Sequence, residues 1–153
     1  MEMQVNNLDD TFDLDDINVV VGFKKDLIME RFPELTYIYN PFFDQTNTSK
    51  SLLKALRKNR DKSVLWLNGD KLSKTVKNGL GEAVGINFIA AKDIKSFITR
   101  LEQCDDNDYF ERGLELAIEK DGLKISAVDI SDYNCMEVDF KEDLENANTL
   151  FRK

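Results

Sequence analysis

The run Val-Leu-Trp-Leu at residues 64–67, followed by Asn-Gly-Asp, constrains the fold more than any other stretch of this chain. Consecutive apolar residues that stop at turn residues are typical of a strand buried on both faces, as parallel strands in α/β proteins are. In open parallel sheets the ligand crevice lies beyond the carboxyl ends of the strands, so such a strand would hold Asp70 at a site. Gly69 would let the backbone turn sharply and a ligand come close. The alternative is that Asn-Gly-Asp only closes the strand as a turn.

Strand and helix patterns alternate on both sides of this run. Before it, they predict a buried strand at 17–23, a short helix at 24–32 with Leu27 and Ile28 packed inward, and a strand at 36–39. After it, they predict strands at 85–90, 123–130 and 136–140, and helices at 91–102, 109–119 and 141–152. Such alternation predicts a parallel sheet with right-handed crossovers.

Composition limits the class of protein. The chain has 153 residues, of which 42% are apolar, enough for one core, and we expect an acidic lead-in at 1–16 and a single α/β domain at 17–153. Its 29 acidic and 21 basic residues give a net charge of -8, which argues against nucleic acid or a membrane as partner. The absence of histidine excludes histidine bases and the usual zinc sites. Without an apolar span or a signal-like start, we expect a cytoplasmic protein whose thiols are reduced.

A polar stretch at residues 46–51 precedes an amphipathic helix that contains Leu52, Leu53 and Leu56. Thr48 or Ser49 is the expected N-cap residue of this helix. One interpretation is a capped helix and nothing more. The other is that the loop and the free N–H groups of the helix hold a nucleotide base or a phosphate.

Several motifs resemble those of one family of enzymes. They are Val-Val-Val-Gly-Phe-Lys-Lys (19–25), Tyr-Asn-Pro (39–41), Thr-Asn-Thr-Ser-Lys-Ser-Leu (46–52), Leu-Trp-Leu-Asn-Gly-Asp (65–70), Glu-Ala-Val-Gly-Ile-Asn (82–87), Asp-Tyr-Phe-Glu (108–111) and Met-Glu-Val-Asp-Phe-Lys-Glu-Asp-Leu (136–144). In this order and spacing they resemble the nucleotidyltransferases that make activated sugars and cytidine-diphosphate-choline-like compounds. The branch most similar to them is that of the phosphocholine cytidylyltransferases, and the resemblance runs from about residue 17 to residue 151.

The resemblance implies a doubly wound α/β fold with a mixed, mostly parallel sheet flanked by helices, as in nucleotide-diphospho-sugar transferases. It implies transfer of a nucleotidyl group, CMP from CTP, to a small phosphorylated acceptor such as phosphocholine or a sugar phosphate. Asp70 and Asp139 would hold Mg²⁺, which prefers oxygen ligands and would neutralise charge on the nucleotide phosphates. The nucleotide-binding residues carried over are Asn47, Thr48, Ser51 and Gly69.

Glu111 matches a motif that lies near the acceptor in the family. The alternative for Glu111 is an exposed carboxylate on a helix surface.

The chain departs from the family pattern in two places, and these departures indicate an alternative function. Residues 1–16 lack the family's glycine-rich loop with an arginine and its Pro-Lys pair, which cradle the triphosphate. Residues 71–81 lead almost directly into Glu82, where the family has a helix and several strands. The alternative is therefore a truncated, catalytically inactive homologue that acts as a binding module or as an oligomeric structural module. A sheet edge left bare by a missing first strand would favour pairing with another copy as a homo-oligomer.

Overall fold

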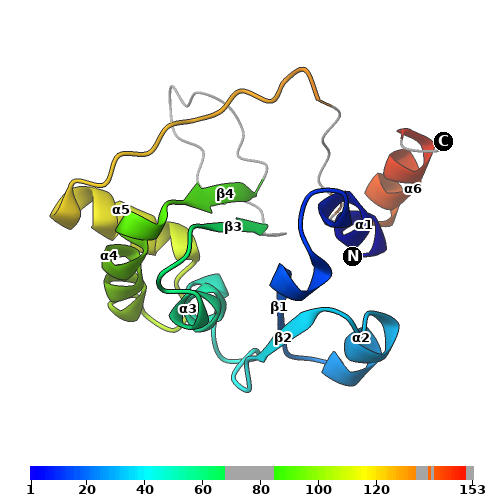
Figure 1. The fold of residues 1–153 in the computed structure, drawn as a ribbon, viewed down its shortest axis with the longest axis horizontal. Helices are drawn as coiled ribbons and strands as arrows, with labels where there is room; N and C mark the ends of the chain where they lie inside the picture. Colours follow the sequence, from blue (N-terminus) through cyan, green and yellow to red (C-terminus); the bar gives the residue numbers. More distant parts are fainter. Residues whose placement is uncertain (68–84, 134–137, 139, 151–153) are drawn as a thin grey trace. The chain divides into compact units, whose positions relative to one another are not determined.

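The computed structural model describes residues 1–67, 85–133, 138 and 140–150. Over these residues the protein is a mixed α/β structure with two two-stranded sheets (Figure 1). It divides into two compact units, one of Met1–Val64 with Ile89–Leu123 and one of Leu65–Phe88 with Lys124–Lys153. The elements are α1 (Glu2–Asp9), η1 (Leu14–Asp16), β1 (Asn18–Val21), α2 (Lys25–Arg31), β2 (Thr36–Tyr39), α3 (Thr48–Lys58), β3 (Val64–Leu67), β4 (Ile86–Ile89), α4 (Ala91–Glu102), α5 (Phe110–Asp121) and α6 (Lys141–Leu150).

Strands β1 and β2 form a parallel pair in the first unit, with Asn18 opposite Thr36 and Val21 opposite Tyr39. This confirms the predicted strands and their parallel pairing, which the crossover through α2 makes possible. The packing of α2 was predicted wrongly, because Leu27 is 60% exposed and the helix buries none of its residues. Seven residues make too short a helix to turn a full apolar face to the sheet.

Helices α3, α4 and α5 pack against one another in the first unit (Figure 1). Their shared core contains Leu52, Leu53 and Leu56 from α3, Ile94, Phe97, Ile98 and Leu101 from α4, and Phe110, Gly113, Leu116 and Ala117 from α5. The bounds predicted for α4 are confirmed. On α5, Leu116 is buried whereas Ile118 is 45% exposed. Cys104, in the turn after α4, is buried.

Gly113 allows α5 to approach α4 closely. A Cβ atom built there would lie 2.6 Å from Cδ2 of Leu101 and 3.2 Å from Cε2 of Phe97. Both of those side chains are fully buried. A larger residue at 113 would therefore require the helices or the two side chains to move.

The carboxyl end of α5 is tied to α4 by polar groups. Asp121 accepts hydrogen bonds from the Arg100 guanidinium and from the Ser96 hydroxyl. These donors lower the pKa of the Asp121 carboxyl to about 2. Gly122 then ends the helix in the left-handed conformation at φ 67°.

The second unit corrects two predictions. Leu65 and Leu67 on β3 are 41% and 43% exposed, so the prediction that this strand is buried on both faces is wrong. Alternate residues of β3 are half-buried instead, as in a strand with one covered face. No strand forms at 123–130, where Ile125 and Val128 are 56% and 81% exposed. The alternating apolar residues alone do not make this segment a strand, because none of the described strands pairs with it.

The ends of the chain carry two further helices. The acidic lead-in, for which no helix was predicted, forms α1 and η1, and Glu2 makes an ion pair with Arg31 at 3.1 Å. The closing helix is confirmed as α6, with Ala147 buried and Leu144 48% exposed. The strand predicted at 136–140 falls largely outside the described residues. Among the helices that the structure describes, none combines the length and the apolar character needed to cross a bilayer.

Candidate functional site

The chain leaves β2 at Asn40, whose side chain is the centre of a hydrogen-bond network. Asn40 is 1% exposed. Its Oδ1 accepts from the backbone N–H of Phe42 at 3.1 Å, and its Nδ2 donates to Thr46 Oγ1 at 3.1 Å and to Ser51 Oγ at 3.2 Å. Asparagine suits this position because its amide can close a turn in its own backbone. The network fixes the loop between β2 and α3 against the first turn of α3.

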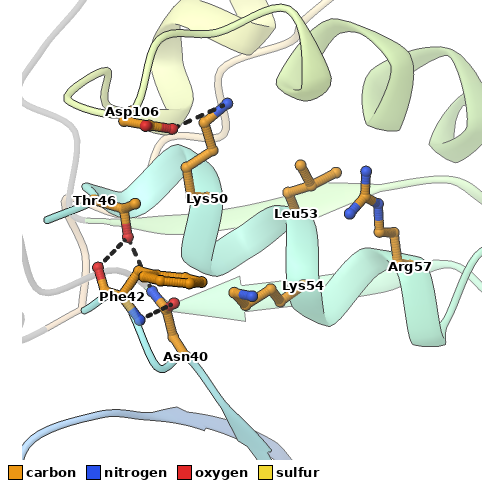
Figure 2. Close-up of a pocket in the computed structure, with 8 residues that line it drawn as sticks. All are labelled: Asn40, Phe42, Thr46, Lys50, Leu53, Lys54, Arg57 and Asp106. Carbon is orange, nitrogen blue, oxygen red and sulfur yellow. Dashed lines mark hydrogen bonds and ion pairs between the residues drawn. The ribbon is translucent and has the colours of Figure 1, made fainter.

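A pocket of about 160 Å³ lies beside this network (Figure 2). The residues that line it come from the end of β2, the following loop, α3 and the turn between α4 and α5: Asn40, Phe42, Thr46, Lys50, Leu53, Lys54, Arg57 and Asp106. All belong to the first unit. The pocket therefore lies beyond the carboxyl end of a parallel strand, where α/β proteins commonly bind ligands.

Three basic residues of α3 line the pocket, at positions 50, 54 and 57. Spacings of four and three residues place them on one side of the helix. The Lys50 ammonium donates to the carbonyl oxygen of Cys104 at 2.5 Å and lies 3.9 Å from the Asp106 carboxylate. The Arg57 guanidinium bonds the Glu102 carboxylate at 2.7 Å.

Lys54 differs from its two basic neighbours on α3. Among the described residues, none forms a hydrogen bond or an ion pair with its ammonium group. Its side chain runs along the pocket in the direction of Phe42 (Figure 2). Lys54 is thus a positive charge at the pocket that no described acidic group neutralises.

Asn47 begins α3 as its N-cap residue, so the prediction of Thr48 or Ser49 as the cap was wrong. Asn47 has extended backbone angles, and its side chain accepts from the backbone N–H of Thr48 at 2.8 Å. Its Nδ2 also donates to the carbonyl oxygen of Asn107 at 3.3 Å. Thr48 is already helical, and its Oγ1 accepts from the backbone N–H of Phe110 at 3.1 Å. These bonds join the amino ends of α3 and α5.

The structure brings four of the predicted site residues into one region. Asn47, Thr48 and Ser51 lie in the first turn and a half of α3, and Ser51 contributes to the Asn40 network. Glu111 lies in the first turn of α5, next to the residue that bonds Thr48, and is half-buried rather than exposed. Its roles, and those of the other three, stay predictions. Gly69, Asp70 and Asp139 lie outside the described residues.

Sequence reasoning missed the pocket residues Asn40, Lys50, Lys54 and Arg57 as candidates. Two signals could have found them. The asparagine stands between the end of a strand and Pro41, and the basic residues recur at helical spacing after the polar loop.

The pocket offers cationic groups, which suit the oxygens of a phosphate or a carboxylate. Asp106 is the carboxylate that lines it, and that group faces Lys50. No group of three or more cysteine or acidic side chains arranged to bind a metal occurs in the part of the chain that the structure describes. Two carboxylates such as Asp70 and Asp139 have the donor chemistry that Mg²⁺ prefers. Burial raises the pKa of the neighbouring Cys104 thiol, which disfavours the thiolate form.

Comparisons of the chain with models of protein families, with curated proteins and with solved structures found no match.

Proposed function

We propose that the pocket on α3 binds the phosphate group of a small phosphorylated ligand, and that the chain uses this ligand in Mg²⁺-dependent transfer of a nucleotidyl group. The observation that carries the binding step is Lys54, a cation at a concave surface with no acidic partner among the described residues. In a protein whose net charge is -8, an anionic ligand needs such a local positive group. The transfer step rests on the motif resemblance.

The size of the pocket limits what it holds. At about 160 Å³ it is smaller than the roughly 300–1,000 Å³ of a typical small-molecule site. A phosphate or phosphomonoester fits this space, whereas a whole nucleoside triphosphate does not. We therefore assign the pocket to one phosphate group, with the rest of the ligand outside it.

The roles of the residues follow from their chemistry. Lys54 would hold the phosphate by a charge-assisted hydrogen bond, and the Asn40 network would keep the loop and α3 in place around it. Asp70 and Asp139 would hold Mg²⁺, which would neutralise charge on the nucleotide phosphates during transfer. In the transfer, an oxygen of the acceptor's phosphate forms a bond to the α-phosphorus of CTP while the bond to pyrophosphate breaks.

The binding step is tested by titration calorimetry with phosphocholine and with CTP, on wild-type protein and on Lys54→Gln. The variant keeps most of the side chain's apolar stem and removes its charge. We expect phosphocholine affinity to fall about tenfold, as for the loss of one charge-assisted hydrogen bond of roughly 1.5 kcal/mol. Lys58→Gln is the matched control, since Lys58 is exposed on the same helix and does not line the pocket. Equal affinities for all three proteins would contradict the assignment of the pocket.

The transfer step has a separate test. CTP titrations with and without Mg²⁺ on wild type, Asp70→Asn and Asp139→Asn report whether these carboxylates hold the metal. We expect Mg²⁺-dependent CTP binding in the wild type and its loss in both variants, with release of pyrophosphate when phosphocholine is added. Phosphocholine binding that persists without any Mg²⁺-dependent CTP binding would instead favour the catalytically inactive binding module.

A further inference from the structure

The outer edge of β1 has backbone groups that none of the described strands satisfies. The Ile17 carbonyl accepts from Thr36 N–H at 3.0 Å, and the Val21 carbonyl accepts from Asn40 N–H at 2.8 Å. These residues therefore face β2, and because strand residues alternate, the backbone groups of Asn18 and Val20 face away from it. In the described part of the chain, β2 is the strand that pairs with β1.

We propose that this edge pairs with β1 of a second copy of the chain, antiparallel and around a twofold axis at Val20. In this register Val20 and Val20 of the second copy exchange both of their N–H···O bonds, and Asn18 lies opposite Gly22 of the second copy. A symmetric interface of this kind is self-complementary and closes as a dimer. It satisfies backbone groups that would otherwise form an open sheet edge.

The charges that flank β1 favour an antiparallel pair, because acidic residues of η1 precede the strand and lysines follow it. Asp16 precedes Val20 by as many residues as Lys24 follows it, and the same holds for Asp15 and Lys25. The proposed pairing therefore brings each aspartate to the lysine end of the second copy.

Two of the charges that flank β1 already make weak ion pairs within the monomer. β1 ends at Val21, but the long lysine side chains can reach past the end of the strand. Within the monomer Asp16 lies 3.3 Å from Lys62, and Lys25 lies 2.9 Å from Asp26. Three of these four side chains are more than 60% exposed and that of Lys25 is 37% exposed, so the pairs are weak and can be exchanged.

Apolar side chains also match in this register. Ile17 lies opposite Phe23 of the second copy, and Val19 lies opposite Val21 of the second copy. Phe23 is 69% exposed in the monomer, although its ring lies 6.3 Å from that of Phe43 between centroids. Pairing would cover part of that ring, and aromatic and β-branched cross-strand pairs stabilise antiparallel strands.

Charge reversal tests the proposal by sedimentation equilibrium. Asp15→Lys with Asp16→Lys makes both flanks of β1 basic, and Lys24→Asp with Lys25→Asp makes both acidic. We expect each double variant to raise the dimer dissociation constant about tenfold or more, because surface pairs of modest strength change from attraction to repulsion. An equimolar mixture of the two double variants should restore dimers, since each copy then meets the opposite charge. Asp9→Lys with Asp10→Lys is the control for net charge and should leave the dimer unchanged.

A backbone variant tests the strand pairing itself. Val20→Pro removes the outward N–H of β1 and leaves the bonds to β2, as proline is tolerated at a free strand edge. We expect loss of the dimer with an unchanged far-ultraviolet circular dichroism spectrum. A wild-type protein that is monomeric at every concentration would overturn the proposal. So would a mixture of charge-reversed variants that does not associate, or a control variant that dissociates as the test variants do.

Discussion

Gly113 offers a quantitative test of how α4 and α5 pack. Replacing it by alanine adds a Cβ atom 2.6 Å from Cδ2 of Leu101, a fully buried side chain. Alanine is better than glycine in a helix by about 1 kcal/mol. Overpacking a well-filled core costs about 1–3 kcal/mol. The contact outweighs the helix preference, and we expect Gly113→Ala to lower the free energy of unfolding by about 1 kcal/mol.

The sign of the effect should reverse once the contact is removed. Leu101→Ala alone should cost about 2–5 kcal/mol, as for other buried leucines. In that background the methyl group that Gly113→Ala adds enters vacated space, so the added methyl and the helix preference both stabilise, by about 1–2 kcal/mol together. The two substitutions should therefore be coupled by about 2 kcal/mol or more.

Urea unfolding of the wild type, both single variants and the double variant, followed by circular dichroism, measures this coupling. Equal slopes with urea concentration across the four proteins are the control that the denatured states are comparable. If Gly113→Ala has the same effect in both backgrounds, to within about 0.5 kcal/mol, the close approach of the two helices at Gly113 is refuted.

The end of α5 carries two further predictions. Because the pKa of the Asp121 carboxyl is lowered in the fold, its carboxylate stabilises the fold at pH values above 3.8, the pKa of the unfolded chain, and this stability is lost as the pH falls toward about 2. Acid titration of the unfolding midpoint should therefore show a smaller loss over that range in Asp121→Asn than in the wild type. Gly122→Ala should cost about 1 kcal/mol, because alanine is strained at φ 67° although no atom of the described residues lies within 4 Å of the added Cβ. Thermal unfolding should show a smaller loss for Gly122→Asn, and equal stability of Gly122→Ala and wild type would show that the strain is absent.

Elements with strong local patterns were predictable from the sequence. Residues Ala91–Glu102 carry apolar side chains at helical spacing, and the helix has those bounds and that buried face. Thr36–Tyr39 was also predicted with its observed limits, because turn-forming residues flank it. In both cases the residues that determine the element lie within about a dozen positions of one another in the sequence.

Features that depend on tertiary partners were not predictable in this way. Alternation at 123–130 predicted a strand, but a strand forms only where another strand can pair with it. Leu116 and Ile118 lie on nearly opposite sides of α5, and the position of α4, which approaches closely at Gly113, determines which of them is buried. The cap of α3 moved to Asn47 because its amide can also bond the chain near Asn107, a contact 60 residues away.

The candidate site was likewise predictable only where local motifs identified its residues. Motif order led to the start of α3, where Asn47, Thr48 and Ser51 lie together. The motifs did not identify Lys54 as a site residue, because the feature that distinguishes this lysine is the lack of an acidic partner among the described residues. Local sequence cannot reveal such a lack, since the acids that engage Lys50 and Arg57 come from residues 106 and 102.

The contacts that hold α3 have a consequence for how the protein is made. Thr48 bonds Phe110, and Lys50 bonds Cys104, so the partners of α3 follow it by more than 50 residues. While the ribosome synthesises the intervening chain, the leucine face of α3 has neither α4 nor α5 to cover it. Such a nascent segment is exposed to misassociation until the later helices emerge. Slow synthesis between residues 58 and 91 should therefore increase the dependence of this protein on chaperones.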